Sequence, residues 1–414
     1  MNHFIPSRDP AEGLGVLMLF RLIEESIPAF FRPDRTIHVA RAPGRLDVMG
    51  GLAGEAAATV LHLPIAEAAC TAIQARDDDL VRLWSPCRDG SRTQMLSLRL
   101  GDLGLPAAPI AYAEGRALLT ADPRDRWAGY LLGGLLALAR ERAVLPPHGA
   151  ELLLHSDVPS ECGVAASTSI IVAALRAFAL LYGFELTAHD LAELCQIVET
   201  EVLGVEARRC DPMTTVLAES GELLVLDGPV GDLSGRLAVP SDLEFVALDT
   251  GVRRVADAPT PVALGADAGR ADADRVARFR SLLEQPPSLE LRSALGDVMF
   301  DAHDAYVAAG RSHAAADLVV QQARARREAG GGVLGAKLTG VGGGATVLLL
   351  GERTKVWYEA LRLKKALLEA TGHSAHVFRW SSPGALSFGS IELAPDPDRD
   401  ADPDAAPERP DGEV

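Results

Sequence analysis

The stretch HSDVPSECGVAASTS, residues 155–169, decides the fold, because it leads from a strand-like apolar run through a tight turn into a helix. Pro159 and Gly163 break the strand pattern, and a strongly apolar helical pattern covers 168–182. Only small residues stand where that helix opens. A helix N-terminus presents unpaired N–H groups and the positive end of its dipole, so small side chains there let an anion approach the backbone.

Two further glycine-bearing turns follow strand patterns, RAPGRLDVMGG at 41–51 and KLTGVGGGATVLLL at 337–350. Taken singly, such a turn is most often only a turn, and Ser167 and Thr168 suit equally well a helix that they merely cap. The chain has no GxxxxGK[ST] motif of a P-loop, and GVGGGA leads into a strand rather than into the helix of a Rossmann turn. A phosphate site built from these turns therefore requires a different nucleotide fold.

Length and composition indicate an enzyme-sized globular protein. The chain has 414 residues, of which 48% are hydrophobic and 5% aromatic, enough for two domains with cores of their own. Strand and helix patterns mix without regular βαβ alternation, which predicts the α+β class. The segment DGPVGDLSGRLAVPSD, 227–242, is a candidate domain boundary, and the Ala/Asp/Pro-rich segment 256–274 is a candidate loop or lid.

Charge and cysteine content exclude several function classes. A formal net charge of −17 argues against a nucleic-acid partner, since phosphate backbones are bound through a surplus of Lys and Arg. The tail after Leu393 has eight acidic residues against two arginines and cannot form a packed core. LGVLMLF, 14–20, is too short to span a bilayer, so we expect a cytoplasmic protein with no membrane partner. The cysteines lack metal-ligand spacing and are interpreted as packing residues: Cys70, Cys87, Cys162, Cys195 and Cys210.

Together, and in this order, the three turns resemble the motifs of the GHMP kinase family. APGRLDVMGG, PSECGVAASTS and LTGVGGGATV match its first, second and third motifs, and LGDVMFDAHDAY (295–306) and SSPGA (381–385) are similar to its L-arabinokinase and galactokinase branch. The resemblance covers about 36–393. It implies the GHMP kinase fold, an N-terminal ribosomal-protein-S5-like α/β domain plus a C-terminal ferredoxin-like α+β domain. The implied division is an N-terminal helical extension, 1–35; a nucleotide-binding domain, 36–240; a C-terminal domain, 241–393; and a disordered acidic tail, 394–414.

The resemblance also implies roles for individual residues. The catalytic aspartate falls on Asp211, with Arg45 beside it; Ser167 and Glu199 match the Mg²⁺-binding residues, and ATP is the phosphoryl donor. The implied phosphate cradle comprises Pro159, Gly163, Val164, Ala165, Ala166, Ser167, Thr168, Gly340, Gly342 and Gly343. The implied acceptor contacts are Arg45, Asp47, Glu55, Arg208 and Asp211. His303 aligns with a family histidine and is interpreted as structural or as a support for the site.

These residue types also suit the chemistry without the family. Phosphoryl transfer needs a cradle for phosphates, a divalent cation that neutralises them, and a group that orients or deprotonates the attacking hydroxyl. The hydroxyl of Ser167 and the carboxylate of Glu199 are the hard oxygen ligands that Mg²⁺ prefers. An arginine near Asp211 would keep that carboxylate ionised. Without the family, the favoured interpretation is that Glu199 is a solvated residue on the face of an amphipathic helix and Asp211 a loop carboxylate.

The chain departs from the family where the acceptor is recognised. Galactokinases continue the first motif into Glu, His and Asp that hold sugar hydroxyls, and the equivalent positions here are Gly51, Leu52 and Gly54, followed by Glu55. Glu161 brings a negative charge into the phosphate turn, where it opposes ATP unless it faces outward.

A second departure precedes the catalytic aspartate, where the family has a glycine and this chain has Arg208 and Arg209. Two arginines form a natural fork for a carboxylate or phosphate on the acceptor. They could as well point to solvent or pair with Glu201 and Glu206.

The leading hypothesis is an ATP- and Mg²⁺-dependent GHMP-type sugar kinase that phosphorylates the anomeric hydroxyl of an L-arabinose- or galactose-like sugar. The alternatives are a kinase for an anionic sugar such as a uronic acid, and a non-catalytic ligand sensor on the same fold. A monomer or a homodimer is expected.

Overall fold

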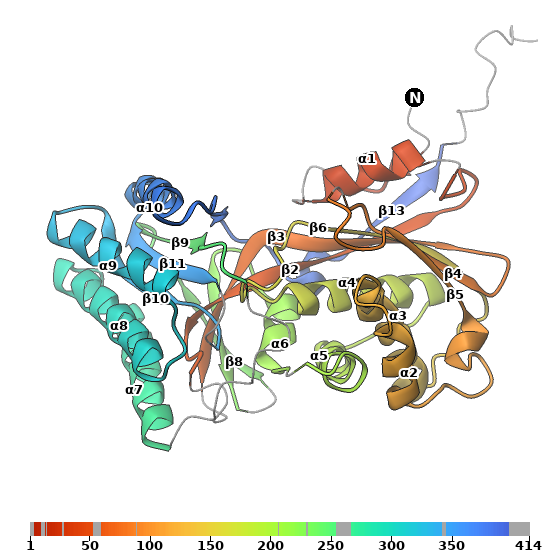
Figure 1. The fold of residues 1–414 in the computed structure, drawn as a ribbon, viewed down its shortest axis with the longest axis horizontal. Coiled ribbons are helices and arrows are strands. Elements are labelled where there is room, and N and C mark those ends of the chain that lie inside the picture. The colour runs from red at the N-terminus through yellow and green to blue at the C-terminus, as the bar shows by residue number, and fades with distance from the viewer. Residues whose placement is uncertain are drawn as a thin grey trace, which may run out of the picture.

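The computed structural model of the chain describes residues 4–396, apart from 10–12, 14, 27–28, 53–58, 88, 206, 229–230, 254–265 and 342–344. Within these residues the strands form one nine-stranded and one four-stranded sheet (Figure 1). Nearly all pairings are antiparallel, and helices cover both sheets. This arrangement confirms the α+β class predicted from the mixed strand and helix patterns.

The first sheet is built around the long strand β3 (Val60–Ala75). β2 (Ile37–Met49) pairs with nearly all of it, β7 (Glu222–Asp227) pairs with its first residues, and β6 (Ala150–Ser156) pairs with its second half. Every residue of β3 except the last is buried, as in strands that are covered on both faces.

The other strands of this sheet extend it in both directions. The order is β1-β13-β2-β3-β6-β4-β5, with β8 outside β7. Their bounds are β1 (Phe4–Pro6), β13 (Ser390–Pro395), β4 (Leu80–Trp84), β5 (Met95–Arg99) and β8 (Asp232–Ala238). The predicted C-terminal domain, 241–393, therefore gives its last strand to the first sheet, and the strand runs past residue 394, where the tail was predicted to begin. The tail beyond residue 396 lies outside the described residues.

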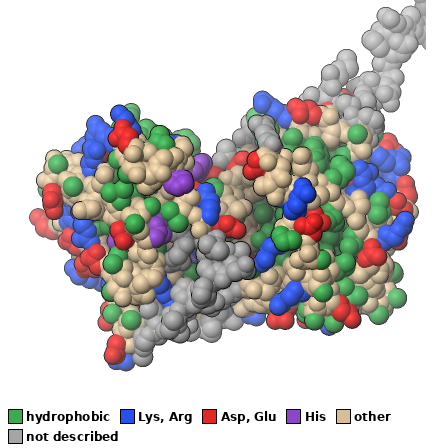
Figure 2. Space-filling view, viewed as in Figure 1, with side chains coloured by type: hydrophobic (Ala, Val, Ile, Leu, Met, Phe, Trp, Pro, Cys, Tyr) green, Lys and Arg blue, Asp and Glu red, His purple; other side chains and the backbone are tan. Residues whose placement is uncertain are grey.

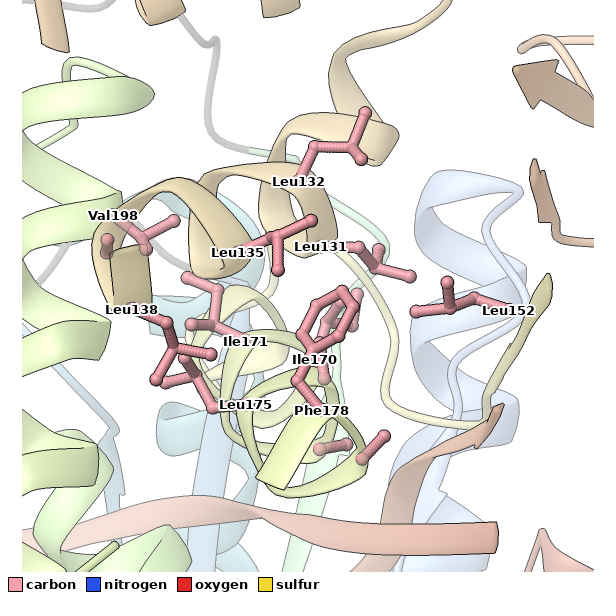
Figure 3. Packing of buried hydrophobic residues seen from close by; sticks show 14 of the residues in the cluster. Leu131, Leu132, Leu135, Leu138, Leu152, Ile170, Ile171, Leu175, Phe178 and Val198 are labelled. Carbon is pink, nitrogen blue, oxygen red and sulfur yellow. The ribbon is translucent and has the colours of Figure 1, made fainter. Parts of the chain in front are cut away.

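Two helices, α3 (Arg126–Arg142) and α4 (Ala166–Tyr182), form layers on one face of the first sheet, and α1 (Val16–Ser26) covers the other face (Figure 1). α4 lies between the sheet and α3, so it is buried on nearly all sides, which explains its apolar sequence. Figure 3 shows Leu135 and Leu138 of α3 beside Ile171 and Leu175 of α4. Gly183 ends α4 with a φ of +71°, as the sequence predicted.

The second sheet has the order β10-β11-β9-β12. Alternate residues of β9 enter different cores: Phe245 and Ala247 pack with α7 and α8, whereas Val246 and Leu248 pack with α9 and α10. The bounds are β9 (Leu243–Asp249), β10 (Val333–Leu338), β11 (Thr346–Glu352), β12 (Val377–Phe378), α7 (Ala266–Leu283), α8 (Leu289–Ala308), α9 (Ala314–Glu328) and α10 (Lys355–Thr371). The first of these two cores also contains β2 and β3 residues, so it joins the two sheets.

Two predicted loops are partly regular structure. The candidate boundary 227–242 contains β8, which pairs with β7. The candidate loop 256–274 includes the first two turns of α7, and its earlier residues lie outside the described part of the chain. The remaining elements are η3 (Leu100–Leu103), α2 (Tyr112–Leu119), α5 (Ala188–Ile197), the π-helical η4 (Val198–Val202), α6 (Cys210–Leu217) and α11 (Ala385–Phe388).

Two observations concern membrane contact and surface charge. Among the described residues, no helix is both long enough and apolar enough to cross a bilayer. On the face shown in Figure 2, Lys and Arg side chains alternate with Asp and Glu side chains.

Candidate active site

The three glycine turns predicted from the sequence lie together. A Cβ added to Gly44 would lie 2.6 Å from the carbonyl oxygen of Val164, and the backbone N–H of Arg45 donates to that oxygen at 3.0 Å. In the third turn, a Cβ on Gly340 would lie 3.4 Å from the carbonyl oxygen of Gly163. The absence of a side chain at Gly44 is therefore what lets the first and second turns make contact.

The second turn leaves the start of α4 open. Ala165 is the N-cap residue, with a φ of +63° and no side chain capping the helix. The first i→i−4 bond runs from the N–H of Ser169 to the carbonyl oxygen of Ala165, at 3.0 Å. The N–H groups of 166–168 thus have no intrahelical acceptor, which is the arrangement that binds anions. Gly342 and Gly343, predicted for the same cradle, lie outside the described residues.

Other residues of the second turn give it its shape. The carbonyl oxygen of Pro159 accepts a hydrogen bond from Cys162 Sγ at 3.1 Å, and the side chain of Val164 is buried in the core between the sheets. Glu161 has a φ of +60° and an exposed side chain. Its carboxylate is therefore solvated, and solvent screens its charge.

The hydroxyls of Ser167 and Thr168 do not cap α4, as one interpretation of the sequence had them do. Both donate to Oε1 of Glu199, at 2.6 and 3.2 Å. Glu199 is 4% exposed, and burial raises its pKa to about 7, although the two hydroxyl donors favour the charged form. The two hydroxyls carry no formal charge, so they do not neutralise the negative charge of this buried carboxylate.

A π-helical turn places Glu199 in the site. The segment η4 continues α5 with the wider π geometry, which often marks a functional position. It packs closely on α3, where a Cβ added to Gly133 would lie 3.0 Å from Val198 Cγ1. Because Gly133, in the middle of α3, has no side chain, η4 can approach α3 closely. This contact helps to position Glu199 near the start of α4.

Asp211 and Arg45 form a buried bidentate ion pair. Arg45 Nε donates to Oδ1 at 2.9 Å and Nη2 donates to Oδ2 at 2.7 Å, and the Arg45 side chain is 4% exposed. Asp211 stands in the first turn of α6, where the helix dipole also favours an anion. Burial opposes ionisation of Asp211, but Arg45 and Arg208 outweigh it and hold its pKa well below the ordinary value.

The two arginines before Asp211 diverge. Arg208 points into the site, with Nη2 3.5 Å from Asp211 Oδ1 and 3.8 Å from Asp47 Oδ2. Arg209 points away and donates from Nε to Gln196 Oε1 at 2.6 Å. The predicted two-arginine fork is therefore wrong, because only Arg208 lies near Asp211 and Asp47.

Asp47 is the centre of a second group of charges. It is fully buried, with Oδ1 3.8 Å from Lys337 Nζ and Oδ2 3.7 Å from His62 Nε2. Burial opposes its ionisation, but the Lys337 ammonium, the His62 side chain and the Arg208 guanidinium together outweigh the burial and hold the pKa of Asp47 at about 2. These distances exceed those of hydrogen bonds, so the carboxylate is ionised without being bonded to its neighbours.

His62, Cys210 and Asp211 bring ligand atoms within 4.8 Å of one another. Burial raises the pKa of the Cys210 thiol to about 12, so the thiol is protonated at neutral pH. Arg45 occupies both oxygens of Asp211. These conditions disfavour a soft cation at this cluster, in keeping with the interpretation of Cys210 as a packing residue.

Two residues of α8 connect the site to the second sheet. His303 is buried, and its Nδ1 accepts a hydrogen bond from the N–H of Leu338 at 3.3 Å. The Tyr306 hydroxyl donates to the carbonyl oxygen of Gly340 in the third turn. His303 thus holds α8 against β10, a structural position like the one predicted for it.

The sugar-clamp positions of the first motif cannot act here as they do in galactokinases. A Cβ on Gly51 would lie 2.1 Å from both the Tyr306 hydroxyl and the Gly340 carbonyl oxygen, and Leu52 is buried in the core of the second sheet. Gly54 and Glu55, the latter predicted as an acceptor contact, lie outside the described residues.

Sequence reasoning missed His62 and Lys337 as parts of the site. His62 lies in the largely apolar strand β3, and Lys337 is the one charged residue of the apolar strand β10. Buried ionisable residues are usually paired with a partner of opposite charge or a hydrogen-bonding group. An ionisable residue within an apolar strand pattern was therefore a signal by which the sequence could have identified both.

Comparisons with known proteins identify a matching family model, similar sequences and a similar solved structure. Residues 130–218 match the model of the GHMP kinases N terminal domain. The chain is 26% identical to L-arabinokinase of Arabidopsis thaliana over 88% of this chain and 47% of that protein, and 31% identical to galactokinase of Chloroflexus aggregans over 52% of this chain and 49% of that protein. The crystal structure of Lactococcus lactis galactokinase complexed with galactose superposes with a TM-score of 0.72 at 16% identity, covering 88% of this chain and 99% of that one.

The two sheets, the open start of α4 and the ion pair at Asp211 define a protein with the GHMP kinase fold. The chain contains a match to the GHMP kinases N terminal domain and is similar to L-arabinokinase and to galactokinases. It spans about half the length of the L-arabinokinase and of the Chloroflexus galactokinase.

Proposed function

We propose that the protein is an ATP- and Mg²⁺-dependent sugar kinase, a phosphotransferase that uses an alcohol group of an L-arabinose- or galactose-like sugar as acceptor. One observation carries the proposal: the Arg45–Asp211 pair and the Ser167–Glu199 pair both adjoin the second turn and the start of α4. Arg45 Nη1 donates to the Gly163 carbonyl oxygen at 2.6 Å, which ties the acceptor side to the phosphate turn. We further propose that it acts in the cytoplasm as a monomer or a homodimer.

The N–H groups of 166–168 and the second and third turns would hold the phosphates of ATP. The α4 dipole adds positive potential there, and the small side chains of Ala165 and Ala166 leave the backbone accessible. The Ser167 and Glu199 oxygens fit Mg²⁺, because they are hard ligands and because Glu199 has no cationic side chain bonded to it among the described residues. When bound, the cation neutralises phosphate charge.

Asp211 suits the role of an orienting group better than that of a strong base. Arg45 and Arg208 keep its pKa far below neutrality, so it binds a proton weakly. As a fixed anion it accepts a hydrogen bond from the acceptor hydroxyl and aligns the oxygen with the γ-phosphorus. Arg45 is placed to stabilise negative charge that develops as the bond to ADP breaks.

ADP release tests the proposal. The full chain is incubated with MgATP and, separately, L-arabinose, D-galactose and D-galacturonate. We expect turnover with at least one sugar and only background hydrolysis without any. Bound nucleotide with no turnover on every acceptor would refute the kinase activity and favour the alternative of a ligand sensor, for which the lost clamp at Gly51 is the supporting observation.

A further inference from the structure

A surface cavity of about 510 Å³ lies between the last turn of α9 and one face of α10. Lys355, Glu359 and Arg362 of α10 line one side of it, and Arg326 of α9 and the turn 329–332 line the other. The volume falls within the roughly 300–1,000 Å³ that small-molecule sites occupy. None of these residues belongs to the candidate active site, so the cavity is a separate feature of the molecule.

The lining of this cavity is basic although the chain as a whole is acidic. Three cationic side chains line it, those of Arg326, Lys355 and Arg362, against the single carboxylate of Glu359. The formal net charge of the chain is −17. A cavity with surplus positive charge on an acidic protein concentrates anions that the rest of the surface repels.

The distribution of lysine also singles out α10. The chain has four lysines, of which Lys337 is buried in β10. The other three, Lys355, Lys364 and Lys365, are all in α10, and the remaining permanently cationic side chains are those of arginines. An ammonium group is a compact point charge on a flexible stem, which suits it to binding a phosphate. The surface lysines are thus concentrated on the helix that forms the cavity wall.

The ion pairs at the cavity hold its cations in place without neutralising all of them. Glu359 is 6% exposed and accepts a hydrogen bond from Arg362 Nη1 at 2.7 Å. Its other oxygen lies 3.4 Å from Arg326 Nη1 and has no hydrogen bond among the described residues. One carboxylate therefore serves two guanidinium groups. Lys355 pairs with Glu352, and because both side chains are partly exposed, an incoming anion can replace that carboxylate at little cost.

The backbone on both sides of the cavity leaves room for an anion. Residues 330–332 are all glycine, so no side chain covers this part of the wall. A Cβ on Gly332 would lie 2.3 Å from Lys355 Cβ, so a glycine is required where the turn passes the start of α10. The N-cap residue of α10, Thr354, makes no side-chain capping bond, and the positive end of the helix dipole adds to the potential near Lys355.

We propose that this cavity binds a small molecule that carries a phosphate group, at a site separate from the phosphate cradle at α4. Arg326 and Arg362 donate hydrogen bonds to phosphate oxygens, and Lys355 adds a point charge. Tyr358 also lines the cavity, and its side chain, which is 62% exposed, offers a ring face and a hydroxyl to the rest of the molecule. A phosphate monoester carries more charge than a carboxylate at neutral pH and so matches the surplus of cations better.

The hairpin of β10 and β11 separates this cavity from the candidate active site. Gly332 precedes β10 and Lys355 follows β11, whereas the third turn joins the opposite ends of the two strands. The six residues of β10 span about 20 Å at about 3.3 Å per residue. A small molecule in the cavity therefore does not contact phosphates held at α4. The inference goes beyond the proposed function and does not depend on it.

Calorimetry on the full chain tests the inference. The protein is first saturated with Mg²⁺ and a non-hydrolysable ATP analogue, which fills the cradle at α4, and is then titrated with inorganic phosphate or with α-D-galactose 1-phosphate. We expect at least one probe to bind, and Arg362→Gln to weaken it about tenfold or more, since a charged hydrogen bond is lost. Equal affinity for the two probes would identify free phosphate as the ligand, and tighter binding of the ester a phosphate ester.

Lys365→Gln is the matched control. It removes the same charge from α10, but Lys365 pairs with Glu369 and does not line the cavity, so its affinity for the probe should equal that of wild type. An equal loss in Lys365→Gln and Arg362→Gln would show only a general attraction to α10 and would overturn the inference. So would the absence of probe binding to wild type, or an unchanged affinity in Arg362→Gln.

Both altered side chains are exposed, Arg362 at 60% and Lys365 at 79%, so the variants should keep the wild-type melting temperature. If Arg362→Gln does not fold, Lys355→Gln takes its place in the same comparison, because Lys355 lines the cavity and is 64% exposed. The readout is a difference between variants far from α4. Loss of the proposed kinase activity would therefore leave this result unchanged, and failure of this test would leave the kinase proposal unchanged.

Discussion

The candidate site has two buried carboxylates, Asp211 and Glu199, with opposite electrostatic surroundings. Asp211 lies among guanidinium groups, which hold its pKa far below the ordinary value, whereas Glu199 lies among hydroxyls, and its pKa rises to about 7. Burial penalises both. The neighbouring charge therefore decides which group is a permanent anion and which one still lacks a counter-charge.

This difference indicates different roles for the two carboxylates. A permanent anion orients an acceptor hydroxyl at any pH at which the protein is folded. A carboxylate short of positive charge binds a cation strongly, because the cation removes the electrostatic cost of burial. We call the surroundings of Asp211 the guanidinium side and those of Glu199 the hydroxyl side. Each substitution below alters one side only and so tests whether the two sides act independently.

The largest effect is expected from Asp211→Asn. The amide keeps the shape but loses the charge, so turnover should fall about 10³-fold or more while nucleotide binding is retained. Arg45 loses its buried partner, and the melting temperature should fall as well. ADP release and binding of a fluorescent ADP analogue measure the two properties. Retained turnover would remove Asp211 from the mechanism.

Glu199→Gln should give a large loss of Mg²⁺-dependent turnover, about 10²-fold, together with a gain in stability. The folded-state pKa of about 7 exceeds the reference value of 4.5, so the wild-type protein loses stability as pH rises from 4.5 to 7. The variant lacks this titration. Without divalent cations it should be more stable than wild type by about 2–3 kcal/mol at pH 8, and the gain should vanish near pH 4.5.

Denaturant unfolding at the two pH values measures that gain. Equal stability of Glu199→Gln and wild type at pH 8 would contradict the assigned proton affinity, even if activity is lost. A gain of the same size at both pH values would indicate a packing effect instead.

The sequence predicted the phosphate turn and the positions of Glu199, Asp211 and Arg45 better than the surroundings of Asp47. Ser167 and Thr168 adjoin a turn whose glycines and small residues reveal it locally, and the family resemblance brought Glu199, Asp211 and Arg45 to it. The surroundings of Asp47 depend on contacts between segments far apart in the chain, such as the 3.8 Å approach to Lys337. No local pattern encodes such a contact.

The arginines at 208 and 209 show the same limit within two adjacent residues. Their sequence gives each the same charge, and only the start of α6 decides which one faces Asp211 and which one faces Gln196. The strand order was equally hidden, since β13 joins the first sheet from the far end of the chain. Pairing across such separations is set by the whole fold.

Arg45→Lys tests the geometry of the guanidinium side with its charge kept. A lysine preserves a cation near Asp211 but cannot donate to both oxygens and to the Gly163 carbonyl group at once. Turnover should fall about 10- to 100-fold, mainly in kcat, with little change in Mg²⁺ dependence. A change in the half-saturating Mg²⁺ concentration as large as the change in kcat would show that the two sides are coupled.

The smallest effect is expected from Thr168→Val, which removes the weaker of the two hydrogen bonds to Glu199 and keeps the shape of the side chain. A donor to the charged form lowers a carboxyl pKa, so its loss raises the pKa of Glu199 further above 7. At pH 7 more of the enzyme is then protonated at this group, and the half-saturating Mg²⁺ concentration should rise about three- to fivefold. At pH 9 both proteins are ionised there and the difference should disappear. An equal difference in half-saturating Mg²⁺ concentration at both pH values would mean that Thr168 acts by positioning Glu199 and not by changing its pKa. The contrast between the hydroxyl side and the guanidinium side would then have no electrostatic basis.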